Sequence, residues 1–138
     1  MAIDKNISNK VKDEIIHSGR DTRYDLEAYR FVIQGLEMYI MSLPSRRHVS
    51  GQELALGLLH IAHKQFGLLA PTVLGQWGIF ATKDFGSIVY NLISIGLLGK
   101  TDQDRLEDFF NVIDFNVFFA AQNCFIIDRD YIASVRGA

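Results

Sequence analysis

Apolar positions recur with the spacing of an amphipathic helix over most of this chain, and the pattern is most regular between residues 82 and 95. Positions 85, 88, 89, 92 and 93 are all apolar, which places their side chains on one face of a helix. Thr82 is the expected N-cap, and the charge of Asp84 favours the first turn. Gly96 and Gly99 end the pattern. The spacing therefore predicts a helix that begins at Thr82.

Residues 22–44 show the same periodicity and predict a longer helix upstream. Thr22 and Asp25 have the spacing of a capping box, and Pro44 ends the helix. The apolar positions that share its predicted inner face are Leu26, Tyr29, Ile33, Leu36 and Ile40.

The next helix is predicted to begin after Ser50 and to end at Gly67. Ser50 and Glu53 form the pattern of a capping box, in which each side chain binds the other residue's backbone amide. Gly67 is a natural C-terminal stop. A short helix should follow, with Pro71 in its first turn.

The two ends of the chain and the segment after residue 98 are less regular. Residues 1–20 are consistent with either an arm or a weak helix, and residues 128–138 with an irregular tail. Apolar residues point in all directions from 109 to 119, so residues 100–119 fit a helix or a short β-hairpin after residue 98. The prediction is a mainly α, single compact helical domain over residues 21–127, with a winged-helix-like arrangement as an open alternative.

Composition agrees with one globular domain. The chain has 138 residues, of which 49% are hydrophobic, and a net charge of -2. No block of like charge indicates a nucleic-acid tail or a membrane-binding segment. Cys124 is the single cysteine, so no internal disulfide is expected. The first ten residues lack the apolar core of a signal peptide, and a cytoplasmic location is expected.

Residues 65–99 carry only two charges, Lys83 and Asp84. Glycines and Pro71 interrupt this stretch, so it does not resemble a membrane span. It should therefore be buried or face a partner.

The helix predicted from Thr82 has an outward face that is small and neutral, with Gly86, Tyr90 and Ser94 on it. Solvated helix faces normally carry charge, whereas interface cores lack charge and are enriched in aromatic residues. Burial within the chain is the equally weighted alternative, and the phenylalanines of residues 109–119 are more readily explained as core than as a second patch. The candidate partner-binding residues are Trp77, Lys83, Ser87, Tyr90, Asn91 and Ser94.

The succession of a short helix, a turn at residues 78–81 and a second helix also fits a helix-turn-helix. On this alternative the nucleic-acid candidates are Arg46, Arg47, Lys83, Asn91 and Lys100. The outward face offers only Lys83 as a cation, and Asp102 and Asp104 would repel phosphate. Nucleic-acid binding is therefore disfavoured.

Glu53, His60 and His63 form a weak candidate metal site, because histidines three apart share one side of a helix. The two histidines lie on the polar sector, where solvated surface residues are the simpler explanation. No phosphate-binding glycine motif or catalytic pattern is present in the sequence, and no cofactor is predicted. A metal protein or an undetected enzyme is the third hypothesis.

Four segments carry a resemblance to a family. They read HVSGQEL, FGLLAPTVLGQWGI, TKDFGSIVYNLISIGLLGKTDQD and EDFFNVIDF, and with RYDLEAYRFV upstream they cover roughly residues 22–119. In these the chain resembles an uncharacterised family of short bacterial proteins. The resemblance implies a bacterial cytoplasmic protein with a single compact domain, but no activity and no site residues. The chain departs from the family's pattern in LALGLLHIAHKQFG, where more charged residues are expected.

Together these observations favour a non-enzymatic protein that acts through protein–protein interaction, as a homo-oligomer or with a protein partner. Nucleic-acid binding by a winged-helix-like fold is the alternative. No membrane association is expected.

Overall fold

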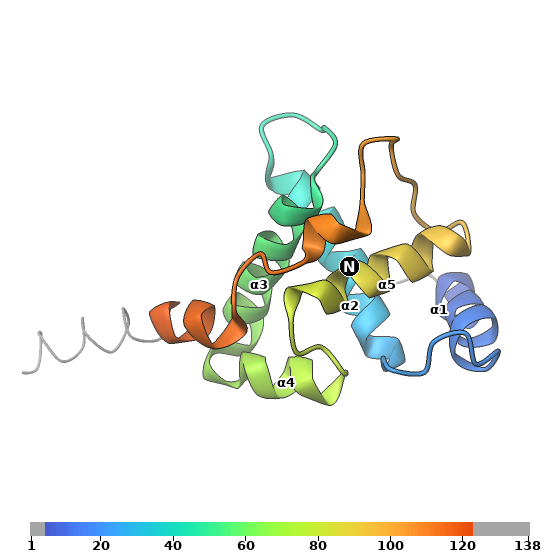
Figure 1. The fold of residues 1–138 in the computed structure, drawn as a ribbon, viewed down its shortest axis with the longest axis horizontal. Coiled ribbons are helices and arrows are strands. Elements are labelled where there is room, and N and C mark those ends of the chain that lie inside the picture. The colour runs from blue at the N-terminus through green and yellow to red at the C-terminus, as the bar shows by residue number, and fades with distance from the viewer. Residues whose placement is uncertain (1–4, 123–138) are drawn as a thin grey trace, which may run out of the picture.

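The computed structural model describes residues 5–122, and it is mainly helical (Figure 1). The α-helices are α1 (Lys5–Val11), α2 (Leu26–Ser42), α3 (Gly51–Phe66), α4 (Ala70–Gln76) and α5 (Thr82–Ser94). A π-helical turn, η1 (Lys12–Ile16), continues α1, and two 3-10 turns, η2 (Gly67–Leu69) and η3 (Leu106–Phe109), follow α3 and α5. Residues 115–122 are helical as well. The predicted class, a single compact domain of mainly helical structure, is confirmed.

Helix α5 lies at the centre of the domain, where it packs on α2, α3 and η3 (Figure 1). Its apolar stripe points into the core, and Phe85, Ile88 and Leu92 are fully buried. Burial of this stripe against two longer helices removes most of its apolar surface from water, which is the main source of stability. The fully buried partners from α2 and α3 are Ala28, Tyr29, Val32, Ala55, Leu58, Leu59 and Ala62.

The predicted ends of α3 are confirmed by its hydrogen bonds. The Ser50 hydroxyl accepts a bond from the Glu53 amide at 3.1 Å, and the Glu53 carboxylate accepts one from the Ser50 amide at 3.4 Å. Gly67 ends the helix with a φ of 56°, a backbone conformation that glycine adopts without strain. Pro71 lies in the first turn of α4, as predicted.

The predicted caps of α2 and α5 are corrected. The N-cap of α2 is Asp25, whose carboxylate accepts a bond from the Glu27 amide. Thr22 is not part of this cap. Thr82 is the first residue of α5 and Ala81 holds the N-cap position. The Thr82 hydroxyl does not cap α5, because it donates a hydrogen bond to the Phe109 carbonyl at 2.7 Å. Asp84 reaches back to satisfy the Phe80 and Ala81 amides instead.

The face of α2 that is buried also differs from the predicted one. Of the five residues predicted to face inward, only Tyr29 is fully buried, and burial centres on Ala28, Val32 and Gly35. Leu36 and Ile40 are only half-buried, because they face a pocket.

The β-hairpin considered after residue 98 is absent, since the structure has no strand between residues 99 and 122. A turn and η3 occupy this segment, and Phe109 is buried beside α3 and α5. The described chain therefore has no wing, and the winged-helix alternative loses its distinguishing element.

At the N-terminal end the helical alternative is observed, with Val11 and Ile15 buried in the core. The predicted tail at 128–138, the last five residues of the predicted domain and Cys124 lie outside the described residues. Among residues 5–122 no helix is both long and apolar enough to cross a membrane.

Candidate functional site

The polar side of α5 is covered by the segment that joins η1 to α2. The Asn91 amide donates to the Asp21 carboxylate at 2.9 Å and to the Tyr29 hydroxyl at 3.1 Å. Next to it, Arg20 donates to the Ser94 hydroxyl at 2.7 Å. Asn91 is thus occupied within the domain, and Ser94 keeps an exposed side.

The Gly86 and Tyr90 side of α5 is covered by residues 100–109. Gly86 faces the ring of Phe109, and the Lys100 ammonium lies 5.5 Å from the centre of the Tyr90 ring. The Tyr90 hydroxyl is buried and has no hydrogen-bond partner among the described residues. Burial raises its pKa, and the nearby carboxylates of Asp104 and Asp108 raise it further.

Contacts within the chain therefore account for most of the small, neutral face that the sequence singled out. Trp77 is half-buried, with its ring centre 5.6 Å from that of Phe31 and 5.8 Å from that of Phe66. Ser87 is half-buried too. Of the six partner-binding candidates, only Lys83 and Ser94 are exposed.

Glu53, His60 and His63 do not lie together as a cluster of three potential metal ligands. No group of three or more potential ligands occurs in the part of the chain that the structure describes. The Glu53 carboxylate instead accepts bonds from Arg47 at 2.6 Å and from the Tyr39 hydroxyl at 2.9 Å. The Arg47 hydrogen bond is the main reason that the pKa of Glu53 is lowered to about 2. His60 packs edge-on against the Phe118 ring.

Three of the five nucleic-acid candidates gather around one pocket. Arg46, Arg47 and Lys100 line it, whereas Lys83 and Asn91 do not. Arg46 and Arg47 are held by carboxylates, at 3.5 Å from Glu37 and 2.6 Å from Glu53 respectively. These pairs offset the charges of Arg46 and Arg47, which weakens their attraction for phosphates, whereas Lys100 forms no ion pair with the residues between 5 and 122.

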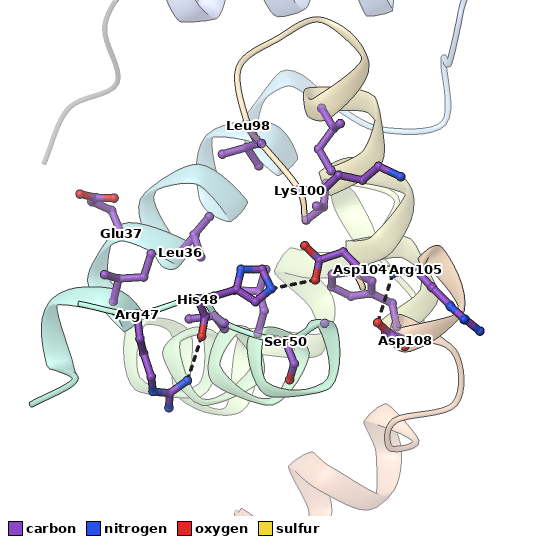
Figure 2. A pocket seen from close by; sticks show the side chains of 18 of the residues that line it. Leu36, Glu37, Arg47, His48, Ser50, Leu98, Lys100, Asp104, Arg105 and Asp108 are labelled. Atoms are coloured by element: carbon purple, nitrogen blue, oxygen red, sulfur yellow. Dashed lines mark hydrogen bonds and ion pairs between the residues drawn. The ribbon is translucent and has the colours of Figure 1, made fainter. Parts of the chain in front are cut away.

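This pocket, here called the charged-rim pocket, has a volume of about 360 Å³ and lies between α2, α3, α5 and residues 98–109 (Figure 2). Its apolar lining residues are Leu36, Ile40, Val49, Leu54, Val89, Ile93, Leu98 and Phe109. Its charged lining residues other than histidine are Glu37, Arg46, Arg47, Lys100, Asp104, Arg105 and Asp108.

A hydrogen bond between His48 Nε2 and Asp104 at 2.8 Å crosses the rim and ties the loop before α3 to the loop after α5 (Figure 2). Asp104 also accepts a bond from the Thr101 amide at 2.8 Å. Burial opposes ionisation of Asp104, but these hydrogen bonds outweigh it and lower its pKa. From the sequence, Asp104 is identified only as a negative charge that would repel phosphate. No pattern in the sequence predicts its hydrogen bond with His48.

A second hollow, here called the aromatic hollow, opens at the N-terminal end of α5 with a volume of about 690 Å³. Phe80 and Phe110 line it and remain exposed, by 71% and 46%. Lys83, Asn111 and Asp114 are its exposed polar lining residues. Lys83 is therefore the one partner-binding candidate that lies here. The sequence favours core over a second patch for the phenylalanines of residues 109–119, and no sequence signal separates exposed Phe110 from its buried neighbour Phe109.

Comparison of the chain with protein-family models, with curated proteins and with solved structures gives no match. The resemblance to a bacterial family therefore remains a prediction.

Proposed function

We propose that this protein acts without chemistry of its own, as an interaction protein that binds a second copy of itself through the aromatic hollow. The observation that carries the proposal is the exposure of Phe80 and Phe110 on the same hollow. Two large aromatic side chains in water lose the favourable free energy of burial, and such rings are enriched at the cores of protein interfaces.

Charge supports a second copy as the partner. The aromatic hollow offers one exposed cation, Lys83, and one exposed carboxylate, Asp114. In a two-fold symmetric contact the same patch meets itself, so Lys83 of each copy can face Asp114 of the other. The patch is neutral in sum and carries little repulsion against itself.

A stable contact buries about 800 Å² on each partner, which is more than two rings supply. The exposed side chain of Val117 lies in the first turn of the helix that begins at the edge of the hollow, and it can extend the contact. The interface is thus expected to include the first turn of residues 115–122.

Self-association tests the proposal directly. Sedimentation equilibrium of the wild-type protein should show a dimer whose population rises with concentration. The double variant Phe80→Ser/Phe110→Ser should be monomeric at the same concentrations, because it removes the apolar centre of the contact.

Met41→Ser is the matched control, since Met41 is 70% exposed but lies outside the aromatic hollow. It should dimerise like the wild type. A wild-type protein that stays monomeric up to its solubility limit, or a double variant that dimerises unchanged, would overturn the proposal.

A further inference from the structure

We infer that residues 99–105 form a flap over the charged-rim pocket, which closes when His48 is protonated and opens when His48 is neutral. The flap is separate from the aromatic hollow and does not depend on self-association. The inference follows from three features, which are the few contacts that hold the flap, the position of His48 opposite a carboxylate, and a buried hydroxyl that has no partner when the flap is closed.

The flap is held to the rest of the domain by few contacts. Leu97 and Leu98 pack against the core, and the flap begins directly after them at Gly99, where an added Cβ atom would meet no atom within 4 Å. Within residues 5–122, no backbone hydrogen bond joins residues 99–104 to a helix. Side-chain contacts therefore hold the flap in place, and segments with so few contacts open at a low cost in free energy.

His48 projects from the opposite loop, which is anchored to α3. The Arg47 side chain donates to the His48 carbonyl at 3.0 Å and to the Glu53 carboxylate at 2.6 Å. Both loops lie at the same end of the domain (Figure 1), and the bond between His48 Nε2 and Asp104 at 2.8 Å joins them across the pocket (Figure 2). Because the His48 loop is anchored, breaking this bond releases the flap.

Protonation of His48 strengthens this bond. Histidine is the residue type that ordinarily gains a charge between pH 8 and pH 5.5. Burial opposes ionisation of Asp104, but its bonds with the Thr101 amide and His48 outweigh burial and lower its pKa, so Asp104 is charged throughout this range. With His48 protonated the bond joins two opposite charges, and with His48 neutral their coulombic attraction is lost.

Other charged residues line the same pocket, but they do not reverse this effect. They are Glu37 of α2, Arg46 and Arg47 before α3, and Lys100, Arg105 and Asp108 after α5. Helices α3 and α5 contribute only uncharged residues. The two arginines before α3 are paired with carboxylates, and the two cations after α5 are equalled in number by Asp104 and Asp108. Asp104 is the one charged group among the described residues that contacts the His48 ring, so it decides the sign.

A buried hydroxyl opposes closure of the flap. The Lys100 ammonium lies 5.5 Å from the centre of the Tyr90 ring, which residues 100–109 cover. The Tyr90 hydroxyl is buried and has no hydrogen-bond partner within the described part of the chain. Water would bind this hydroxyl once the flap lifts, so its burial offsets part of the free energy that the His48 bond provides. The closed and open positions are thereby brought nearer to balance.

The separation of the two loops tests the inference. Nitroxide labels at Ser45→Cys and Gln103→Cys, which are exposed positions, measure it by electron paramagnetic resonance in a Cys124→Ser background. Dilution with unlabelled protein removes distances between copies. From pH 5.5 to pH 8 the distances should become longer and more broadly distributed. The ratio of closed to open flap should fall by about two- to fivefold, which is the effect of one exposed ion pair.

Two substitutions of His48 separate its charge from its position. His48→Gln cannot gain the charge and should show the pH 8 distances at both pH values. His48→Arg carries a permanent charge and should stay closed at both. His17→Gln is the matched control, because His17 also lies beside a carboxylate, that of Asp13 at 3.9 Å, but outside the pocket. It should respond to pH like the wild type.

Three outcomes would overturn the inference. They are wild-type distances that are the same at pH 5.5 and pH 8, a His48→Gln variant that keeps the pH response, and a His48→Arg variant that opens at pH 8. His48 is exposed, so these substitutions leave the core intact, and circular dichroism checks that the helices are retained.

Discussion

Asp21 is a buried carboxylate that joins two separate parts of the chain. It accepts bonds from the Arg23 side chain at 2.7 and 3.0 Å and from Asn91 of α5 at 2.9 Å. The Arg23 hydrogen bond is the largest influence on its pKa, and with the Asn91 bond it outweighs the opposite effect of burial. The pKa of Asp21 is thereby lowered to about 2.

Acid should therefore destabilise the protein through Asp21. The unfolded chain takes up this proton near the ordinary pKa of 3.8, whereas the folded chain takes it up near 2. The stabilisation is complete above pH 3.8 and is lost as the pH falls toward 2. Asp21→Asn should lower the free energy of unfolding by about 1–3 kcal/mol at neutral pH, and the difference from wild type should shrink at about pH 2.

Urea unfolding followed by circular dichroism at both pH values measures this difference. Asp102→Asn, which alters an exposed carboxylate, controls for the change in net charge. A stability difference between Asp21→Asn and wild type that is the same at both pH values would contradict the assignment.

Thr82 offers a second test at the scale of one side chain. Its hydroxyl donates to the Phe109 carbonyl at 2.7 Å and accepts a bond from the Val112 amide at 3.3 Å, in a fully buried position. Thr82→Val has nearly the same shape but leaves both backbone groups unsatisfied. It should cost about 1–3 kcal/mol in urea unfolding, whereas Thr72→Val, at an exposed position of α4, should cost little. Equal stability of the two variants would show that the Thr82 bonds are not important.

Among the elements, η3 is held by the close approach of Phe109 to two helices. A Cβ atom on Gly86 of α5 would lie 2.8 Å from the Phe109 Cβ, and one on Gly51 of α3 would lie 3.0 Å from its ring. The Cβ of Phe109 cannot swing aside as the end of a long side chain can. Glycine at both positions is therefore what allows η3 to pack against α3 and α5.

Gly86→Ala should destabilise the protein by about 1–3 kcal/mol, because overpacking forces η3 away from α5. The loss should exceed the small gain that alanine brings as a better helix former. Thermal unfolding compares it with Gly99→Ala, where the added methyl group meets no atom within 4 Å. A Gly86→Ala variant as stable as wild type would mean that η3 does not depend on this contact.

The helices themselves were largely predictable, because their signals are local. Ser50 with Glu53, Gly67 and Pro71 mark helix ends by chemistry that acts within one turn, and the structure confirms each of them. The N-cap of α5 was not predictable in this way. The Thr82 hydroxyl does not cap the helix, because it donates to the carbonyl of Phe109, which lies 27 residues further along the chain. That contact exists only in the folded chain.

The candidate sites were harder to predict, since they depend on contacts between distant segments. Lys83 is identified as a candidate from the sequence, but its aromatic neighbour Phe110 is not, because Phe110 directly follows buried Phe109 and the apolar pattern of this segment does not distinguish the two. The sequence does not indicate a hydrogen-bond partner for the Asn91 side chain. In the structure its amide donates to the carboxylate of Asp21, which lies 70 residues earlier in the chain. Periodicity identifies which residues share a helix face, but it does not show which other segment covers that face.

On the scale of the whole molecule, α5 connects the two candidate surfaces. Its N-terminal residue pair Thr82 and Lys83 borders the aromatic hollow, and Val89 and Ile93 form part of the floor of the charged-rim pocket. Phe109 and Phe110 are consecutive, and they line the pocket and the hollow respectively. A single packed core around α5 therefore supports both surfaces at once.

One core should unfold as one unit. Trp77 is the single tryptophan, and it packs against Phe31 of α2 and Phe66 of α3. Its fluorescence therefore reports the packing of α2, α3 and α4, while far-ultraviolet circular dichroism reports all helices. The two probes should give the same urea midpoint in the monomeric Phe80→Ser/Phe110→Ser variant, where association does not shift the transition. A fluorescence change well before the loss of helix would instead show that the Trp77 region and the rest of the domain unfold separately.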